Sequence, residues 1–264
     1  MSGVSKAIVQ PLLSWYDAGH RDLPWRSEPA PYRVWVSEIM LQQTRVEAVR
    51  GYFSRWMNAL PDIPALAAAD EAVYTKLWEG LGYYSRVRNL HRAAVLLCEQ
   101  YGGELPADYD RLLALPGVGE YTAGAVASIA FGLPVPAVDG NVLRVAARLD
   151  NDFTPITDAK FKRQTRERFA ALMPSDRPGD LNQSLMELGA TVCLPNGAPR
   201  CDDCPIHHRC EGFRRGNAAV LPLRAAKKAR RVENRTVLVV RCGQLVGLRQ
   251  RPKKGLLAGL WELP

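Results

Sequence analysis

Residues 115–126 form the stretch "LPGVGEYTAGAV", in which a proline and two glycines make a turn directly before a helical pattern. Glycine adopts positive φ readily and lets a ligand approach the backbone closely. At the start of a helix, free N–H groups and the helix dipole favour an anion, most naturally a phosphate. An ordinary tight turn also explains the tetrad at 116–119, so the surrounding sequence has to decide its function.

The chain around this turn has a mainly helical pattern. Between residues 4 and 213, apolar side chains recur at three- and four-residue spacing, with breaks at Pro and Gly clusters. Residues 216–233 are basic and interrupted by proline, which predicts a linker whose charge either follows DNA or is simply solvated. Residues 235–250 have the pattern of a β-hairpin around Cys242 and Gly243. Two strands alone are marginal in water, so residues 234–264 are expected to begin a domain that is incomplete here.

The composition is that of a globular protein, and its positive charge suggests an anionic partner. With 264 residues, 47% of them hydrophobic, the chain can bury more than one core. The net charge of +8 favours nucleic acid or another anion without establishing it. Neither a secretory signal nor a long apolar span is recognisable, which predicts a cytoplasmic protein with no membrane partner. Its six cysteines are then expected to be reduced.

Two acidic residues stand in unusual settings. Glu38 lies within the apolar helical segment "VWVSEIMLQQT", where burial would raise the pKa of its carboxyl and favour the proton-donating form. Asp139 directly precedes the helical segment "GNVLRVAARL", where it can cap the helix while backbone N–H groups keep it ionised. A helix-surface glutamate and a simple N-cap are the ordinary alternatives. Together the two carboxyls could perform general acid–base chemistry.

Four of the cysteines are spaced like metal ligands. Cys193, Cys201, Cys204 and Cys210 follow the spacing C-x7-C-x2-C-x5-C. Zinc accepts four sulfurs, and a neighbouring histidine of "CPIHHRC" could replace one of them. Spacing alone therefore favours zinc slightly.

The segment "LLALPGVGEYTAGAVASIAFG" resembles the helix-hairpin-helix motif of DNA glycosylases, and the match includes the small residues Ala123, Gly124 and Ala125, which let the second helix pack closely. The segments "SEIMLQQT", "GLGYYSRVRNLHRAA", "VDGNVLRV" and "NQSLMELGA", followed by the cysteines, occur in the order found in the adenine DNA glycosylase (MutY) family. The similarity covers roughly residues 8–215. Bifunctional relatives of the endonuclease III group carry a lysine where this chain has Tyr121, and they lack the glutamate that corresponds to Glu38. A phenol cannot form their Schiff base, so the resemblance favours the adenine family.

The resemblance implies a mainly α, two-lobed fold with a cluster loop and a short C-terminal β-hairpin. One lobe, formed by residues 1–28 and 135–215, would hold an iron–sulfur cluster. Residues 29–134 would form a six-helix domain that contains the helix-hairpin-helix motif. Residues 234–264 would be the start of a MutT-like domain, and lesion discrimination is expected to be weak if that domain is never completed.

The resemblance also implies roles for the site residues. Glu38 would protonate the base, Asp139 would stabilise the cationic sugar, and Tyr121 would lie beside the sugar or Asp139. The adenine would be flipped out of the duplex, because its reacting atoms are inaccessible in the stack. Its pocket would be formed by Leu23, Trp25, Arg26 and Glu187.

Further residues are expected to contact the DNA. Gln43 and Tyr83 resemble the residues that intrude at the opposite, lesion-bearing strand, although Gln42 competes for the role of Gln43 and core packing is the alternative for Tyr83. The hairpin would grip the DNA backbone, together with a monovalent cation. Its backbone groups belong to Gly117, Val118 and Gly119.

The family uses C-x6-C-x2-C-x5-C for a [4Fe–4S] cluster, so the resemblance changes the preference from zinc to iron–sulfur, with one extra residue in the first interval. The loop at 196–199 could absorb that residue. Because the protein fills all four positions, the cluster is expected to be structural and to face DNA instead of activating water. Nearby arginines could contact phosphates or simply be solvated; they are Arg200, Arg209, Arg214 and Arg215.

The hypothesis that emerges is a monomeric, monofunctional adenine DNA glycosylase of the cytoplasm, associated with the nucleoid through DNA. Its substrate would be double-stranded DNA with adenine opposite 8-oxoguanine or guanine. Two alternatives differ from it in class: an endonuclease III-like pyrimidine glycosylase with lyase activity, and a non-catalytic DNA-binding module.

Overall fold

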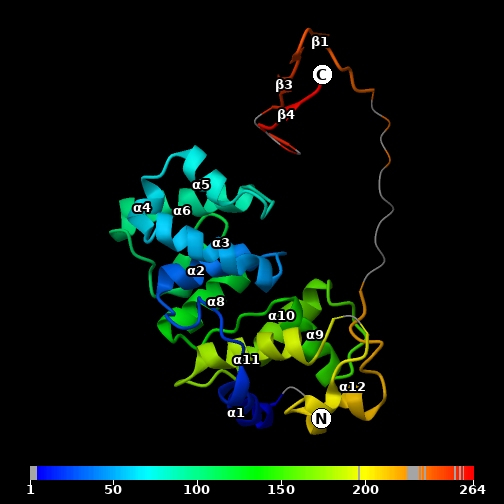
Figure 1. Ribbon diagram of the computed structural model, residues 1–264. Coiled ribbons are helices and arrows are strands. Elements are labelled where there is room, and N and C mark those ends of the chain that lie inside the picture. The colour runs from blue at the N-terminus through cyan, green and yellow to red at the C-terminus, as the bar shows by residue number, and fades with distance from the viewer. Residues whose placement is uncertain are drawn as a thin grey trace. The chain divides into compact units, whose positions relative to one another are not determined.

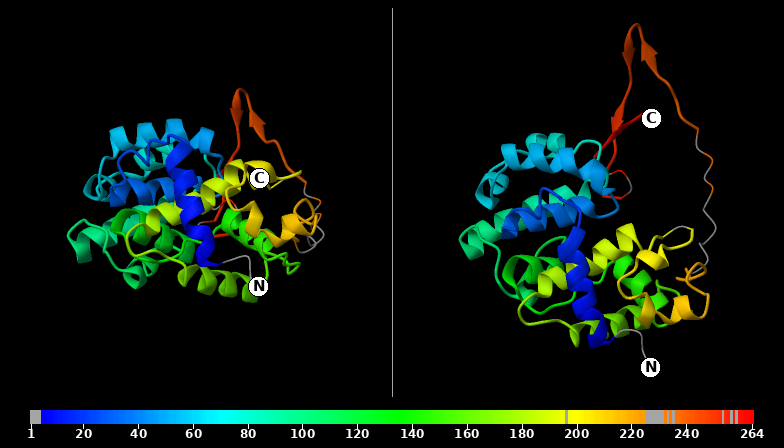
Figure 2. Two further views of the ribbon diagram at one scale, coloured as in Figure 1. Left: turned by 90° about the horizontal axis from the view of Figure 1, so that it is seen from below. Right: turned by 60° about the horizontal axis from the view of Figure 1, so that its bottom comes forward.

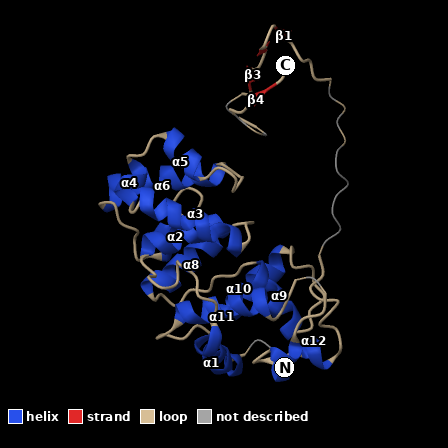
Figure 3. Ribbon diagram, viewed as in Figure 1, coloured by secondary structure: helices blue, strands red, loops and turns tan. Residues whose placement is uncertain are grey.

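A computed structural model describes residues 5–195, 197–224, 232, 234, 236–252, 254, 255, 257 and 259–264. The chain divides into two compact units, Met1–Ala225 and Ala226–Pro264. Helices supply the regular structure of the first unit, as Figure 3 shows, and this confirms the mainly α prediction. Among the described residues, no helix combines the length and the apolar character that crossing a bilayer would take.

The first apolar core of this unit is built around tryptophans. Trp35, Trp56 and Trp78 are fully buried, and the rings of Trp56 and Trp78 meet edge to face at 5.6 Å. Trp56 Nε1 donates to the hydroxyl of Tyr32 (3.0 Å), which satisfies the buried indole N–H. The helices around this core are α2 (Pro31–Leu41), α3 (Val46–Ala59), α4 (Ile63–Ala67), α5 (Glu71–Leu77), α6 (Ser85–Tyr101), α7 (Tyr109–Leu113) and α8 (Glu120–Phe131).

A second core joins the beginning of the chain to its later helices. Helix α1 (Val9–Gly19) packs against α11 (Pro178–Thr191), as Figures 1 and 2 show. Leu12, Phe161 and Leu185 are among the side chains buried there. The other elements of this part are the 3₁₀ turns η1 (Lys6–Ile8), η2 (Cys201–Asp203) and η3 (His207–Arg209) and the helices α9 (Gly140–Leu149), α10 (Ala159–Ala170) and α12 (Glu211–Arg214).

The turn at 114–119 joins two packed helices, α7 and α8, as the motif predicts. Gly117 has φ of +78°, and a Cβ there would lie 2.7 Å from Asn89 Cβ, so glycine is required on both grounds. Gly119 has an ordinary φ of −99° and is the N-cap residue of α8. Only the first of the two glycines therefore uses its conformational freedom.

Helix α8 connects the two cores, because it packs against both α2 and α11. Ala123, Gly124 and Ala125 are buried on it. A Cβ on Gly124 would lie 2.5 Å from the carbonyl oxygen of Pro136. The small side chains thus allow the close packing that the sequence predicts for the second helix of the motif.

The second unit consists of two antiparallel strand pairs. β1 (Arg241–Cys242) pairs with β2 (Leu245–Val246), which confirms the predicted hairpin around Cys242 and Gly243. β3 (Arg249–Gln250) pairs with β4 (Trp261–Glu262), which the sequence did not predict. Each strand has only two residues, and the valines at 237, 239 and 240 are more than half exposed, so the described residues provide no apolar core over this hairpin.

The segment predicted as a linker, residues 216–233, is described only in part. Residues 225–231 and 233 lie outside the described residues. Before them, Leu221 is buried and its carbonyl accepts from Arg148 Nε (2.8 Å). Leu221 therefore anchors this part of the segment to α9 through its buried side chain and its carbonyl.

We expect Gly124→Ala to lower the free energy of unfolding by about 2 kcal/mol, because the new methyl must displace backbone at residue 136. Urea unfolding measures the change. Gly19→Ala is the matched control, since nothing lies within 4 Å of its added Cβ and the residue is helical. Equal stability of the two variants would contradict the close packing of α8.

Candidate active site

A pocket of about 540 Å³ opens between the two cores. Its walls come from residues 21–26, from α2 and the turn after it, from α8, from the start of α9, and from α11. The predicted site residues that line it are Leu23, Trp25, Arg26, Glu38, Gln43, Tyr121, Asp139 and Glu187. Five parts of the sequence thus bring acidic, basic and aromatic side chains to one cavity.

Glu38 is the buried acid of this pocket. It lies on α2 and is 6% exposed. Burial raises the pKa of its carboxyl to about 7, the charge of Asp139 adds to the rise, and the hydroxyl of Tyr121 and the charge of Arg26 oppose it. Near neutral pH the group is therefore able both to hold and to release a proton, as the sequence predicts for this position.

Tyr121 lies on the first turn of α8, so the hairpin before it fixes where its ring stands. Its hydroxyl donates to Glu38 Oε2 (2.5 Å), and Met186 Sδ lies 3.2 Å from the hydroxyl oxygen of Tyr121. Burial raises the pKa of the phenol well above its ordinary value, and the charges of Glu38 and Asp139 raise it further. The tyrosine is therefore a neutral hydrogen-bond donor to the acid.

Asp139 caps α9 and faces the pocket at the same time. Its Oδ1 accepts from the backbone N–H of Val142 (2.8 Å), and its Oδ2 accepts from Asn141 Nδ2 (2.6 Å). Burial raises the pKa of Asp139 above its ordinary value, and these hydrogen bonds oppose part of that rise. The N-cap role and the pocket role considered from the sequence are thus both present, and the hydrogen bonds favour the ionised form.

Hydrogen bonds continue from Asp139 into the cysteine-containing loop. Arg144 Nη2 donates to Asn141 Oδ1 (2.7 Å) and to the carbonyl of Gly189 (2.7 Å). Its Nε donates to the carbonyl of Cys193 (2.8 Å). The buried guanidinium therefore fixes the orientation of the amide that holds Asp139.

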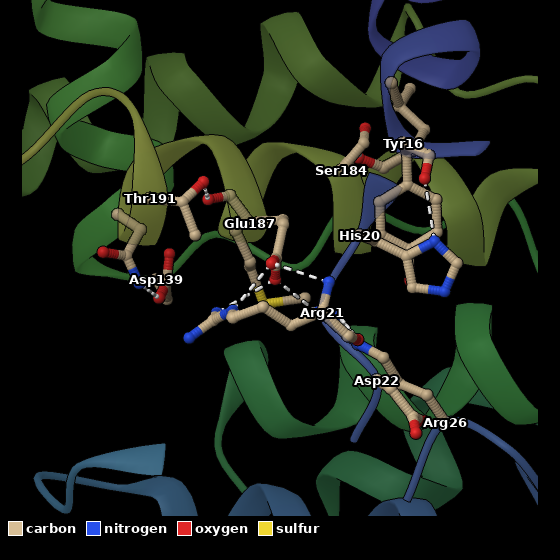
Figure 4. A network of polar contacts seen from close by, with 12 residues as sticks. Tyr16, His20, Arg21, Asp22, Arg26, Asp139, Ser184, Glu187 and Thr191 are labelled. Atoms are coloured by element: carbon tan, nitrogen blue, oxygen red, sulfur yellow. Dashed lines mark hydrogen bonds and ion pairs between the residues drawn. The ribbon is translucent and has the colours of Figure 1, made fainter. Parts of the chain in front are cut away.

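Glu187 is engaged by two guanidinium groups, which Figure 4 shows around its carboxylate. Oε1 accepts from the backbone N–H (3.2 Å) and Nε (2.7 Å) of Arg21, and Oε2 accepts from Arg21 Nη2 (2.9 Å) and Arg26 Nη2 (2.8 Å). Although burial raises the pKa of Glu187, the hydrogen bonds and charges of the two arginines bring it below its ordinary value. A carboxylate offers about four lone-pair sites, so a base would have to share or displace one of these donors.

Sequence reasoning missed Arg21. Its partner lies 166 positions away, and nothing in "HRDLPWR" distinguishes it from a solvated arginine.

Gln42 and Gln43, which follow α2, both remain candidates for the residue that enters the opposite strand, because both line the pocket. Gln42 is already bonded to Thr122 (3.3 Å). Trp25 both lines the pocket and packs edge-on against Phe53 at 5.5 Å.

Known proteins share this architecture. A model of the HhH-GPD superfamily of base excision DNA repair proteins matches residues 36–171. The adenine DNA glycosylase of Mus musculus is 40% identical in an alignment covering 96% of this chain and 59% of that protein. The adenine DNA glycosylase of Mycolicibacterium smegmatis is 42% identical, over 87% of this chain and 79% of that protein. The chain belongs to the adenine DNA glycosylase family of the HhH-GPD superfamily.

A solved structure shows the same fold. The structure of a thermostable thymine-DNA glycosylase matches with a TM-score of 0.70 at 26% identity and covers 80% of this chain and 96% of that one. In contrast, this chain spans little more than half the length of the mouse adenine DNA glycosylase.

Other residues expected to bind DNA lie outside the pocket. Tyr83 is 64% exposed, on the loop before α6. Gly117, Val118 and Gly119 form the hairpin, where the side chain of Val118 is buried. These residues do not line the cavity that holds Glu38.

The four cysteines of the predicted cluster motif line one small cavity beside α9. Arg148 Nη1 lies there, 3.1 Å from Cys193 Sγ, and donates to it. Burial raises the pKa of the Cys201, Cys204 and Cys210 thiols. Within the described part of the chain, no three His, Cys, Asp or Glu side chains come together as ligands of a single ion. Asn196, in the loop predicted to absorb the extra residue, lies outside the described residues.

We expect Glu38→Gln to stabilise the protein more at pH 8 than at pH 5. Between the ordinary pKa of 4.5 and the folded value of about 7, only the unfolded state ionises, so the wild type loses stability as pH rises. The glutamine does not titrate, and the difference between the two proteins should grow by roughly 3 kcal/mol over this range.

Urea unfolding of both proteins at the two pH values measures this difference. Glu99→Gln, on the exposed face of α6, is the control and should show no such dependence. If the Glu38→Gln difference stays constant with pH, Glu38 does not have a raised pKa.

Proposed function

We propose that this protein is a monofunctional adenine DNA glycosylase that hydrolyses the N-glycosidic bond of adenine opposite 8-oxoguanine or guanine in double-stranded DNA. The observation that carries the proposal is the pair of carboxyls in one pocket: Glu38, with a pKa near 7, and Asp139, held by hydrogen bonds that favour its charge. Breaking this bond requires a proton on the departing base and an anion beside the developing sugar cation.

In this mechanism Glu38 donates its proton to N7 of the flipped adenine. The C1′–N9 bond breaks, its electron pair leaves with the neutral base, and positive charge develops on the sugar. Asp139 stabilises that cation and can add to it transiently. Glu38, now ionised, removes a proton from the water that attacks C1′, so the acid is restored and an abasic site remains.

The hydroxyl of Tyr121 supports the acid without taking its place. Because burial keeps the phenol neutral, its hydroxyl can donate to a carboxyl oxygen of Glu38 both when Glu38 is protonated and when it is ionised. It has no amine with which to attack the sugar, so no Schiff base forms and the strand is left uncut. This separates the proposed activity from that of a glycosylase with lyase activity.

The pocket would recognise adenine from several sides. Leu23 and Trp25 supply apolar and aromatic walls, and Arg26 and Glu187 supply polar contacts to the edge of the base.

Other residues would contact the DNA outside this pocket. The backbone of Gly117, Val118 and Gly119 would bind phosphates together with a monovalent cation. Gln43 and Tyr83 would enter the duplex at the opposite strand. We further propose that the protein works on DNA as a monomer in the cytoplasm, associated with the nucleoid.

We expect the full chain to release adenine from a duplex that contains adenine opposite 8-oxoguanine. Glu38→Gln should lower the single-turnover rate by ~10²–10⁴-fold, since it removes the general acid. The wild-type rate should fall as pH rises above about 7, where Glu38 loses its proton. Free adenine and alkali-labile strands are the two products to measure.

Glu99→Gln is the control for this assay and should retain the wild-type rate, because it is exposed on α6. Unchanged adenine release by Glu38→Gln would refute the proposed chemistry. A covalent DNA adduct trapped by borohydride would instead support the lyase alternative, and DNA binding without base release would support a non-catalytic module.

We also propose that Cys193, Cys201, Cys204 and Cys210 hold a [4Fe–4S] cluster. In support, the four cysteines line one cavity, and four cysteine thiolates are the ligands that a [4Fe–4S] cluster takes. The Arg148 guanidinium beside the sulfur of Cys193 would stabilise thiolate charge. When bound, the cluster would supply structural cross-linking of the loop, and the nearby arginines could add contacts to DNA phosphates.

We expect protein purified without oxygen to contain about four iron atoms and four acid-labile sulfides per chain. Cys201→Ser should lose most of this iron, whereas Cys98→Ser, on α6 and away from the cavity, should keep it. Colorimetric iron and sulfide assays give the result. Stoichiometric zinc in place of iron and sulfide would contradict the cluster.

A further inference from the structure

Arg86, on the first turn of α6, joins two loops that lie on different parts of the chain. Its Nη1 donates to the carbonyls at the end of α2, those of Ile39 (2.8 Å), Met40 (3.1 Å) and Gln42 (2.5 Å). Its Nη2 donates to the carbonyls of Leu81 (3.1 Å) and Gly82 (3.3 Å). One guanidinium therefore fixes the end of α2 and the loop before α6 in a single arrangement.

The two loops share an uncommon backbone feature. Gln43 has φ of +60° and Tyr83 has φ of +48°, which lie in the left-handed region that residues other than glycine rarely adopt. Among the described residues only Asn151 and Leu257 are non-glycine residues with the same feature. A left-handed residue persists only where its surroundings over-determine it, and such residues cluster at ligand-binding sites.

Arg86 holds the peptide groups directly before both of these residues. The carbonyl of Gln42 belongs to the peptide that enters Gln43, and the carbonyl of Gly82 belongs to the peptide that enters Tyr83. The guanidinium also lies 5.6 Å from the ring centre of Tyr83 and 5.3 Å from that of the buried Trp78. The side chain that constrains the two backbones thus also contacts the exposed tyrosine itself.

The electrostatics of Arg86 fit a positioning role. Its contacts in the described part of the chain are backbone carbonyls and aromatic rings, with no carboxylate salt bridge. The last carbonyls of a helix carry partial negative charge and favour a cation at that end. Its charge is therefore balanced by oriented backbone groups, so a point-like ammonium or a neutral group could not reproduce the arrangement.

We propose that Arg86 is a positioning residue that holds Gln43 and Tyr83 in their left-handed conformations, so that both side chains are ready to enter the duplex together when adenine is extruded. This inference rests on the proposed function, in which those two residues intrude at the strand opposite the adenine. Arg86 acts on extrusion and leaves the chemical step to Glu38 and Asp139.

The test compares two duplexes that differ in how much extrusion they need. In one, adenine faces 8-oxoguanine. In the other, it faces a tetrahydrofuran abasic analogue, so no pair has to be broken. Arg86→Lys keeps the positive charge but loses the planar guanidinium, whose two Nη groups reach the two sets of carbonyls. We expect its single-turnover rate on the paired duplex to fall at least about tenfold more than on the abasic duplex, which corresponds to about 1.4 kcal/mol at the barrier.

Arg88→Lys is the matched control, because Arg88 lies on the same helix and its guanidinium pairs with Glu71 (3.0 Å) instead of with the carbonyls that Arg86 binds. It should leave the ratio of the two rates at the wild-type value. A second readout is 2-aminopurine placed at the extruded position in the Glu38→Gln background. Arg86→Lys should weaken the fluorescence rise on binding, which a defect in chemistry alone would not do.

Equal slowing of Arg86→Lys on both duplexes, or no slowing on either, overturns the proposal. Arg86→Gln, which keeps an amide donor able to reach one set of carbonyls, replaces the lysine variant if that variant does not fold. Failure of both variants to fold shows a purely structural role and also overturns it. If the wild type releases adenine from neither duplex, the proposed function fails instead, and the two failures are thereby distinguished.

Discussion

The removal of water from one carboxyl, that of Glu38, is the constraint on which the site depends. A carboxyl on a solvated helix is ionised at neutral pH and has no proton to give. Packing α2 against α8 buries Glu38 and raises its pKa to about 7, and the same contact brings Tyr121 within hydrogen-bonding distance.

The second carboxyl depends on a different part of the molecule. Asp139 is held by the start of α9 and by Asn141, and Asn141 is oriented by Arg144, which also bonds to the carbonyl of Cys193. The cysteine loop thus lies two side chains away from the carboxylate at the pocket. A cluster that orders this loop would consequently also fix the position of Asp139, which is proposed to face the sugar cation, without taking part in the reaction.

The features that could be predicted from the sequence are those that depend on local pattern or on resemblance to a family. Helical periodicity gave the mainly α fold, and the small residues after the hairpin gave the close packing at Gly124. Glu38 could be singled out because an acid amid apolar helix positions is unusual. Arg21 could not, because its significance comes from a partner 166 residues away. The exposed hairpin was predicted too long, since alternation indicates strands but cannot show whether a core exists to extend them.

The pocket contains three carboxyl groups, and the differences in their partners explain how they can have different roles. Glu187 accepts four hydrogen bonds from Arg21 and Arg26, so it is ionised but compensated. An uncompensated third charge would raise the pKa of Glu38 further and would hold its proton too tightly for transfer to a base. The two arginines therefore allow Glu187, which is proposed to contact the base, to remain ionised in the same cavity as Glu38, whose pKa is about 7.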